Sequence, residues 1–100
     1  YKPRAPVLIL VGELDDWTPA APCRQMVDAA RAQGEPIDIK VYPGARHSFD
    51  SPNPVRYIAE RVNSNAPGGH GATTGGDPTA WDDAVKRVLA FFAARVAAVK

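Results

Sequence analysis

The apolar run from Val7 to Val11 is the feature that most constrains the fold of this chain. Its residues, VLILV, lie between Pro6 and Gly12 and are rich in β-branched side chains. A short, continuous apolar run bounded by turn residues is typical of a strand covered on both faces, as in a parallel sheet. We therefore expect a buried strand at residues 7–11 of an α/β fold.

A helix and a second strand are predicted to follow this run. Thr18 and Pro19 form an N-cap and a first-turn proline, so we expect a helix from about residue 19 to residue 32 that ends at Gly34. One face of this helix would carry Cys23, Met26, Val27 and Ala30. Apolar and polar residues then alternate from Ile37 to Tyr42, which predicts a strand with one face more exposed than the other.

The second half of the chain predicts a loop between two helices. We expect a short helix at residues 54–62, a glycine-rich loop at residues 63–76, and a final helix from Asp77-Pro78 to about Ala98. The apolar stripe of the final helix would consist of Trp81, Val85, Val88, Phe92, Val96 and Val99, widened by Leu89 and Phe91. On this helical spacing, Trp81, Phe91 and Phe92 are expected to face the core.

These elements are too few to cover a parallel sheet. Two parallel strands joined by a helix bury both sheet faces only when further strands and helices flank them. The chain also begins YKPRAP, without a methionine or a signal-peptide pattern. We therefore expect these residues to be part of a larger sheet, whose other strands lie in an upstream segment or in another subunit.

Composition narrows the classes of partner. The 12 Lys and Arg residues are scattered among 11 Asp and Glu, with a net charge of +1 and no basic stripe, so we expect no nucleic-acid partner. No apolar run approaches the roughly 20 residues that span a membrane, so no membrane partner is expected either. Cys23 is the single cysteine, and its place inside a helix favours packing over nucleophilic chemistry.

Two polar stretches follow the two predicted strands. GELDDWTP comes after the first strand and contains Asp15; YPGARHSFD comes after the second and contains His47. Ligands in open α/β sheets bind beyond the carboxyl ends of the strands, so neighbouring parallel strands would bring these two residues to one edge. A carboxylate that accepts the Nδ1–H of histidine fixes its tautomer and leaves the other ring nitrogen free to act as a base.

The spacing of these residues resembles the C-terminal third of the dienelactone hydrolase family of α/β-hydrolases. The matching motifs are G-x-x-D-x-x-T-P after the first strand, Y-P-G-A-x-H-x-F after the second, and D-P-x-A-x-x-x-A at the start of the last helix. The resemblance implies an α/β-hydrolase fold in which residues 1–100 are the C-terminal segment of one domain, with two parallel strands, a connecting helix and a long C-terminal helix within a larger sheet.

The same resemblance implies the chemistry. Asp15 would be the acid and His47 the base of a catalytic triad that hydrolyses a small-molecule ester or lactone through an acyl-enzyme, with no metal and no organic cofactor. The nucleophile would be Cys or Ser in a G-x-[CS]-x-G elbow, and no such stretch occurs here. We therefore expect the elbow to lie in a missing N-terminal portion or another subunit, and this chain alone to be inactive.

Blander interpretations of the same residues stay open. Asp15 can cap the turn ahead of Pro19, and Asp16 is expected to be exposed or to act as a charge at the helix start. Trp17 would either wall a substrate pocket or pack on the following helix. Arg46 would attract a substrate carboxylate or lie on the surface, and solvent exposure is favoured over metal ligation for the histidine in the glycine-rich loop, His70.

Two other functions compete with the ester hydrolase. The first is a non-catalytic module that dimerises to cover an exposed sheet edge. The second is another enzyme of the same fold, such as a peptidase or an acyltransferase, which would differ in its pocket. The glycine-rich segment at residues 63–76 is where that difference is expected.

Overall fold

The computed structural model describes residues 1–99 of the chain, and describes side-chain burial as far as residue 97. The elements, in chain order, are β1 (Val7–Gly12), α1 (Ala20–Ala32), β2 (Ile37–Tyr42), β3 (Arg56–Val62), a short 3₁₀ turn η1 (Pro67–Gly69), β4 (His70–Thr74) and α2 (Pro78–Val99). Strands and helices alternate at the start of the chain, so the fold is α/β. No helix within the described residues is long and apolar enough to cross a membrane.

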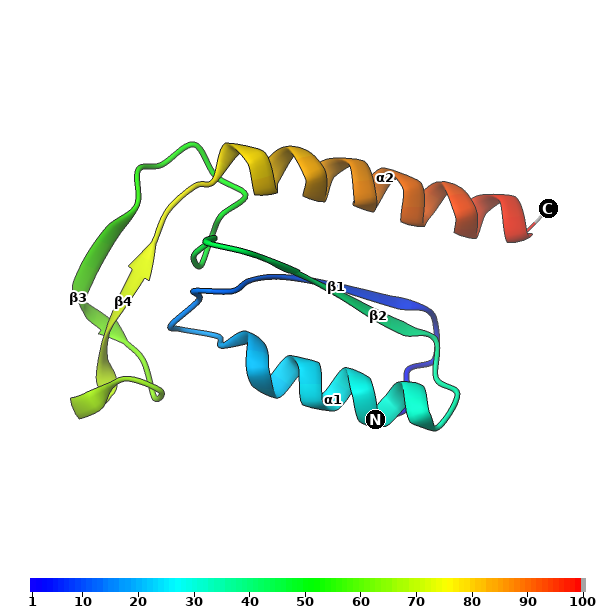
Figure 1. Cartoon of the computed structure of the whole chain (residues 1–100), viewed down its shortest axis with the longest axis horizontal. Coiled ribbons are helices and arrows are strands. Elements are labelled where there is room, and N and C mark those ends of the chain that lie inside the picture. Colours follow the sequence, from blue (N-terminus) through cyan, green and yellow to red (C-terminus); the bar gives the residue numbers. More distant parts are fainter. Residues whose placement is uncertain (100) are drawn as a thin grey trace.

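The strands β1 and β2 are parallel neighbours, paired from Val7 opposite Ile37 to Gly12 opposite Tyr42. Helix α1 connects them and covers one face of the pair, while α2 runs along the opposite face (Figure 1). This confirms the predicted order of strand, helix and strand. The predicted burial of the first strand is corrected, because residues 7–10 are only partly buried and Val11 alone of residues 7–11 is buried. Because the strands are parallel, both carboxyl ends lie at the same edge, and the loops that leave them meet there.

Apolar packing holds α1 on the sheet. Val27 and Ala30 of the helix and Ile37 of β2 form a buried cluster, against which Val7, Ile9, Met26 and Ile39 pack. The helix ends as predicted at Gly34, whose positive φ suits glycine and whose N–H donates to the carbonyl of Arg31. It begins one residue later than predicted, at Ala20.

The predicted N-cap of α1 is wrong. Pro19 occupies the N-cap position, and no side chain caps the first turn. The hydroxyl of Thr18 donates instead to the carboxylate of Asp15, 2.9 Å away. The sequence motif therefore marks the helix start correctly, but the threonine belongs to the loop ahead of it.

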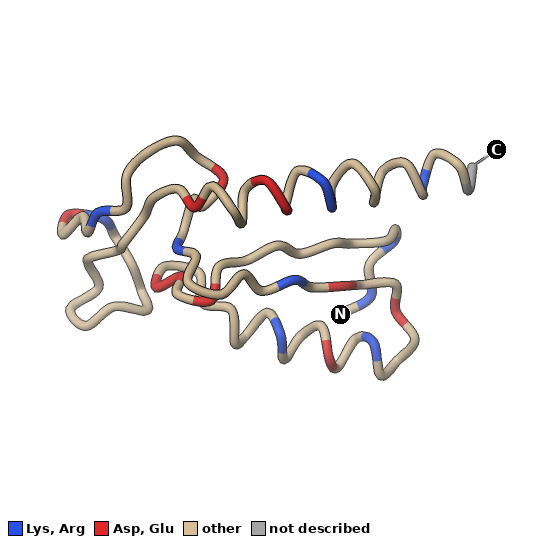
Figure 2. The backbone as a smooth tube through the Cα atoms, turned by 45° about the horizontal axis from the view of Figure 1, so that its top comes forward, with Lys and Arg blue, Asp and Glu red and all other residues tan. Residues whose placement is uncertain are grey.

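Helix α2 meets the other sheet face only near its N-terminus. Ala80 and Ala84 join Tyr42, Ala45 and Phe49 in a second buried cluster, with Leu10 packed against it. Asp77 caps the helix as predicted, because its Oδ1 accepts the N–H of Ala80 at 3.0 Å. Two i,i+4 ion pairs lie in the turns that follow, where acidic and basic positions adjoin in Figure 2.

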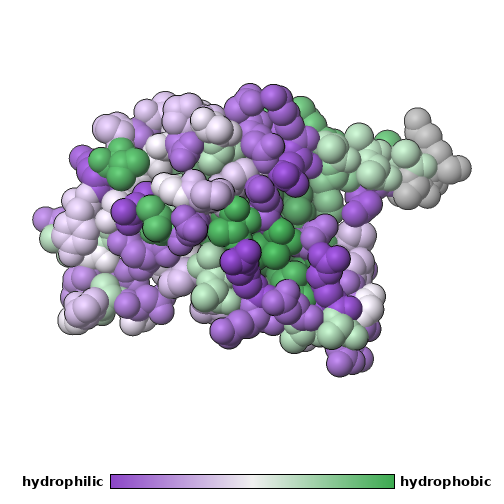
Figure 3. Space-filling model, viewed as in Figure 1, coloured by the Kyte–Doolittle hydropathy of each residue, from purple (hydrophilic) through white to green (hydrophobic). Residues whose placement is uncertain are grey.

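The predicted burial of the apolar stripe on α2 is corrected by the structure. Trp81 and Phe92 are exposed and Phe91 is only partly buried, because the rest of residues 1–97 leaves most of this helix face uncovered. Val85, Val88, Leu89 and Val96 are exposed with them. The side chain of Val99, also placed in this stripe, lies outside the described residues. Figure 3 shows hydrophobic surface between the two helices, on the flank of the sheet.

One polar contact joins α2 to β2. The hydroxyl of Tyr42 donates to Asp83 at 2.7 Å, and Nε of Arg87 donates to the same carboxylate oxygen at 2.6 Å. Burial, followed by this hydrogen bond to Asp83, raises the pKa of Tyr42 from 10.0 to about 12. The hydrogen bonds from Tyr42 and Arg87 in turn lower the pKa of the Asp83 carboxyl below its usual 3.8.

The largest departure from the sequence predictions is an antiparallel hairpin, β3–β4. Residues 56–62 were expected to be helical and form β3; residues 70–74 of the expected loop form β4. Arg56 pairs with Thr74 and Ile58 with Ala72, with an irregularity before Val62 opposite His70. The hairpin stands at one end of the molecule, beside the edge where the β1 and β2 loops meet (Figure 1).

The hairpin forms because β3 pairs with β4, a contact between segments that are separate in the sequence. Segment 56–62 contains good helix formers, but β4 offers it a partner with β-branched Thr73 and Thr74 and the fully buried Ala72. Gly68 and Gly69 both have φ of +76° and turn the chain between the strands. The glycine cluster is therefore the turn of a hairpin rather than an extended loop.

Candidate active site

The loop between β1 and α1, residues 13–19, is called the acid loop here because it carries Asp15. Its first residues are tied to the end of β2: the N–H of Glu13 donates to the carbonyl of Tyr42, and that of Leu14 to the carbonyl of Ala45, both at 2.9 Å. Gly12 permits this close approach, since a Cβ there would overlap the backbone carbonyl of Ala45. Backbone contacts thus fix where the acid loop leaves the sheet.

Asp15 is buried, with 8% of its surface exposed, and its carboxylate is fully engaged. Oδ1 accepts the N–H groups of Trp17 and Thr18 at 2.9 and 2.8 Å, and Oδ2 accepts the Thr18 hydroxyl at 2.9 Å. The turn-capping interpretation of this residue is therefore correct as far as it goes. Turn capping is not the only contact of Asp15, because Oδ2 has a further partner.

That partner is His47, on the loop between β2 and β3 (residues 43–55, the histidine loop). Its Nδ1 lies 3.0 Å from Oδ2 of Asp15 and 3.3 Å from the Thr18 hydroxyl oxygen. Since an ionised carboxylate only accepts hydrogen bonds, Nδ1 must carry the proton in this contact. The structure thus brings together the two side chains that the sequence places at one sheet edge.

His47 is also held from its other side. Its carbonyl accepts the N–H of Gly75 at 3.0 Å, beyond the end of β4. The next residue, Ser48, adopts φ of 61°, the left-handed region that non-glycine residues rarely enter. The ring of Trp17 lies tilted against the imidazole, with ring centroids 4.8 Å apart. The His47 side chain keeps 30% of its surface exposed.

This arrangement can move a proton. A histidine that donates through Nδ1 to a buried carboxylate presents Nε2 with a lone pair, and the carboxylate stabilises the imidazolium that forms when Nε2 takes up a proton. A pocket of about 240 Å³ opens beside these groups; Asp15, Thr18, His47 and Ser48 are among its lining residues.

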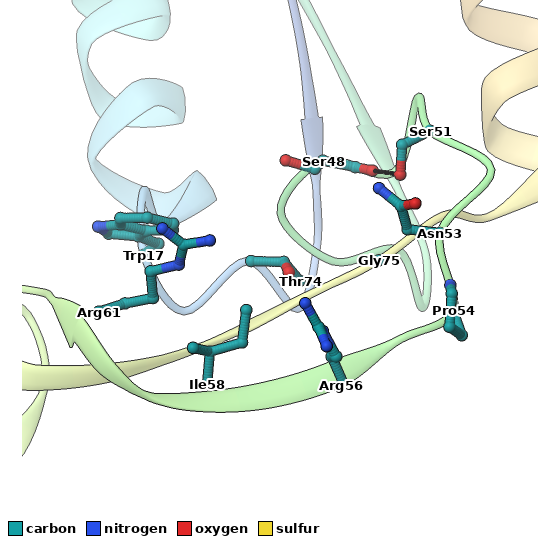
Figure 4. A pocket seen from close by; sticks show the side chains of 10 residues that line it. All are labelled: Trp17, Ser48, Ser51, Asn53, Pro54, Arg56, Ile58, Arg61, Thr74 and Gly75. Carbon is teal, nitrogen blue, oxygen red and sulfur yellow. Dashed lines mark hydrogen bonds between the residues drawn. The ribbon is translucent and has the colours of Figure 1, made fainter.

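A larger pocket of about 480 Å³ adjoins His47 on the hairpin side, and Figure 4 shows its lining. Trp17, Ser48, Ser51, Asn53, Pro54, Arg56, Ile58, Arg61, Thr74 and Gly75 line it. Arg61 lies over the Trp17 ring, 5.9 Å from its centroid, and the two close one side. Arg56 rises from β3 nearby. The lining contains two cationic groups and no carboxylate.

The structure also gives the positions of the other residues that the sequence analysis singled out. Of the two alternatives for Trp17, the pocket wall is the one that the structure favours. Arg46 donates to the carbonyl of Leu14 at 3.3 Å and so bridges the two loops outside the larger pocket. His70 is exposed, with Nδ1 3.2 Å from the carbonyl of Gly68. Cys23 is half-buried on α1.

Two residues at this site escaped the sequence analysis. Asp16, expected to be exposed or a helix-start charge, is partly buried and accepts the N–H of Thr73 with both carboxylate oxygens, at 2.9 and 3.2 Å. Asn63, treated as loop, is 1% exposed and donates to the carbonyls of Asp16 and Gly71. No local signal reveals these contacts, because both depend on the hairpin folding against the acid loop.

Comparison with known proteins agrees with the motifs on which the site is built. Residues 2–96 match the dienelactone hydrolase family. A relative from Methylorubrum extorquens named "Putative carboxymethylenebutenolidase" is 42% identical over 57 residues, which are 57% of this chain and 20% of the relative. The chain thus spans about a fifth of that relative's length. No solved structure matches the chain. The match over residues 2–96 covers nearly the whole sequence, so the chain belongs to the dienelactone hydrolase family.

Proposed function

We propose that this chain is the C-terminal part of an α/β-hydrolase domain that cleaves esters or lactones, and that it supplies the acid and the histidine of the triad. The observation that carries the proposal is the 3.0 Å contact between Nδ1 of His47 and Oδ2 of the buried Asp15. Family membership supports the class of reaction. The smaller pocket, which His47 lines, and the larger pocket, which its neighbours Trp17 and Ser48 line, provide room for a substrate.

The proposed reaction begins with a Ser or Cys nucleophile from outside these 100 residues. Nε2 of His47 takes its proton as the nucleophile attacks the ester carbonyl, while Asp15 stabilises the imidazolium. The proton then passes to the leaving alcohol as the acyl–oxygen bond breaks. His47 next takes a proton from water, which attacks the acyl-enzyme and releases the acid, and the proton returns to the nucleophile. No metal or organic cofactor takes part in this scheme.

The larger pocket would hold the part of the substrate that does not react. Arg56 and Arg61 supply positive charge there, and Ser48, Ser51 and Thr74 supply hydroxyl groups. Guanidinium groups recognise carboxylates through paired hydrogen bonds, so an ester or lactone that bears a carboxylate suits this lining. The name of the relative refers to a lactone of that kind, a carboxymethylene-substituted butenolide.

The test is an activated-ester assay of the longer protein that contains this chain. His47→Ala and Asp15→Asn are each expected to lower kcat/KM by about 10³-fold or more, because the nucleophile loses its base or the base loses its tautomer. His70→Ala is the matched control: that histidine is exposed and outside both pockets, so activity should not change. Full activity in His47→Ala would refute the proposal.

The same scheme predicts that the 100-residue chain alone has no hydrolase activity, because it lacks the nucleophile elbow. The purified chain should not turn over an activated ester above the rate of its own His47→Ala variant. Turnover by the chain that His47→Ala abolishes would place a nucleophile within these residues.

The exposed apolar face of α2 favours a second candidate, a non-catalytic module that associates through this helix. Light scattering of the isolated chain separates the two. The module would be supported over the hydrolase if the isolated chain is a dimer and if substitution of Asp15 or His47 changes neither its association nor any ester hydrolysis.

A further inference from the structure

Hydrogen bonds attach the hairpin β3–β4 to the acid loop, and both the hairpin and the loop contribute side-chain and backbone groups to them. Asn63 Nδ2 donates to the carbonyl of Asp16 at 2.9 Å, Asn65 Nδ2 donates to the carbonyl of Trp17 at 3.0 Å, and the N–H of Thr73 donates to the Asp16 carboxylate. Each of these contacts lands on residue 16 or 17, immediately after the buried Asp15. The acid loop is thus held on its far side by the hairpin.

Asn63 is the central group of this attachment. Its Nδ2 also donates to the carbonyl of Gly71 in β4 at 2.8 Å, and its Oδ1 accepts the N–H of Asn65 at 3.0 Å. Two carbonyls on one side and an N–H on the other allow the amide a single orientation. Only 1% of the surface of Asn63 is exposed. Loss of its amide therefore leaves the buried carbonyl of Gly71 and the partly buried carbonyl of Asp16 without this donor.

Asp16 binds from the opposite direction. Both of its carboxylate oxygens lie within 3.2 Å of the Thr73 N–H, a backbone group of β4 that is two residues from the buried Gly71. The side chain of Asp16 therefore reaches out to the hairpin while its carbonyl accepts from the hairpin. Asn63 and Asp16 together form one polar clasp, defined by these two residues.

The clasp bears directly on the proposed chemistry. The near side of the acid loop is fixed by backbone contacts to β2 at Glu13 and Leu14. Beyond Asp15, its own carboxylate binds only groups of the same loop and His47. The clasp is therefore one of the anchors of the residues after Asp15, together with the contact from Asn65 to the Trp17 carbonyl. It also joins that loop to the strand that carries Arg56 and Arg61.

We propose that Asn63 and Asp16 are positioning residues that hold the Asp15 carboxylate against Nδ1 of His47. The expected effect on turnover rests on the proposed function, whereas the expected effect on the contact between Asp15 and His47 does not. A displacement of about 1 Å between a base and its orienting group lowers turnover by up to about 100-fold. Asp16 and Asn63 line neither pocket, so their substitution removes no side chain that would contact the substrate.

The experiment uses the longer protein that contains this chain, with four variants. Asn63→Ala removes the amide, and Asp16→Ala removes the acceptor for Thr73. Asp16→Asn is the conservative variant, since its amide oxygen still accepts that N–H. Ser64→Ala is the matched control, because it truncates an exposed side chain between Asn63 and Asn65 that belongs neither to the clasp nor to the lining of either pocket.

Two readouts separate positioning from activity. The first is the downfield proton resonance of Nδ1–H in His47, assigned as the resonance that Asp15→Asn shifts or abolishes. The second is kcat and KM for an activated ester. Asn63→Ala and Asp16→Ala should broaden or abolish the resonance and lower kcat by up to about 100-fold, with KM changed less than about threefold. Asp16→Asn and Ser64→Ala should resemble the original protein.

Folded Asn63→Ala and Asp16→Ala proteins that keep both the resonance and kcat would overturn the inference. If Asn63→Ala does not fold, as judged by circular dichroism, Asp16→Ala and its rescue by Asp16→Asn carry the test. If the original protein hydrolyses no ester, the proposed function fails, and the resonance alone still decides whether the clasp holds Asp15 on His47.

Discussion

Each of the two helices of this chain has an apolar face, but only α1 buries most of that face. Helix α1 lies along the parallel strands and buries Val27, whose surface is 1% exposed, together with Ala30. Helix α2 is longer, yet of its described side chains it buries only Ala80 and Ala84 near its start, and Val88 remains 37% exposed. An amphipathic pattern therefore tells which face of a helix is suited to packing, but not whether its partner is present in the same chain.

The largest effect is expected where α1 meets the sheet. Val27→Ala removes two methyl groups from a fully buried position and leaves a cavity, so it should lower the free energy of unfolding of the chain by about 2 kcal/mol. Urea unfolding measures this. The matched change in the other helix, Val88→Ala, should cost less than about 0.5 kcal/mol because the side chain is already in contact with water. Equal losses in the two variants would mean that α2 is packed as tightly as α1.

A smaller effect is expected where α2 is tied to β2 through a polar group. Tyr42→Phe removes the hydrogen bond to the Asp83 carboxylate and should cost about 1–2 kcal/mol near neutral pH. The folded pKa of Tyr42, about 12, lies above its unfolded value of 10.0, so this contribution is complete below pH 10 and is lost as the pH rises toward 12.

The acid side of the same contact has the opposite sign. The folded pKa of Asp83 is lowered below 3.8, so its contribution is present above that pH and disappears as the pH falls through the lower folded value. Unfolding curves at several pH values should show the difference between original and Tyr42→Phe proteins shrinking at both extremes. A difference that stays constant from pH 7 to 12 would contradict the assignment.

The smallest effect on the isolated chain is expected on the exposed face of α2. Leu89→Glu replaces a side chain that is 66% exposed, so the free energy of unfolding should change by less than about 0.5 kcal/mol. The same variant in the longer protein proposed above sharpens the comparison. If other parts of the proposed domain cover this face, the buried charge would lower the free energy of unfolding by several kcal/mol. An unchanged free energy of unfolding in both proteins would show that the apolar face of α2 stays exposed to water.

The contrast between the helices matches what the sequence could and could not predict. The pattern VLILV, the proline before Ala20 and the glycine at 34 act locally, and they predicted β1 and α1 within a residue. The alternation of apolar and polar residues from Ile37 to Tyr42 predicted β2. Parallel pairing then placed Asp15 and His47 at one edge. The hairpin was missed because Arg56, Ala59, Glu60 and Arg61 favour a helix until β4 pairs with them, and the contacts of Asn63 and Asp16 exist only after that pairing.

The parallel pair β1–β2 has one further consequence. Within residues 1–99 each of these strands pairs with the other alone, so each leaves one rim of peptide groups free to accept another strand. A strand that adds there must choose its alignment in steps of one residue, about 3.3 Å, and a slip by one step turns every side chain to the opposite face. A nucleophile at the end of such a strand would therefore lie beside His47 in a single alignment. The register of the added strand would thus determine the distance between the nucleophile and His47.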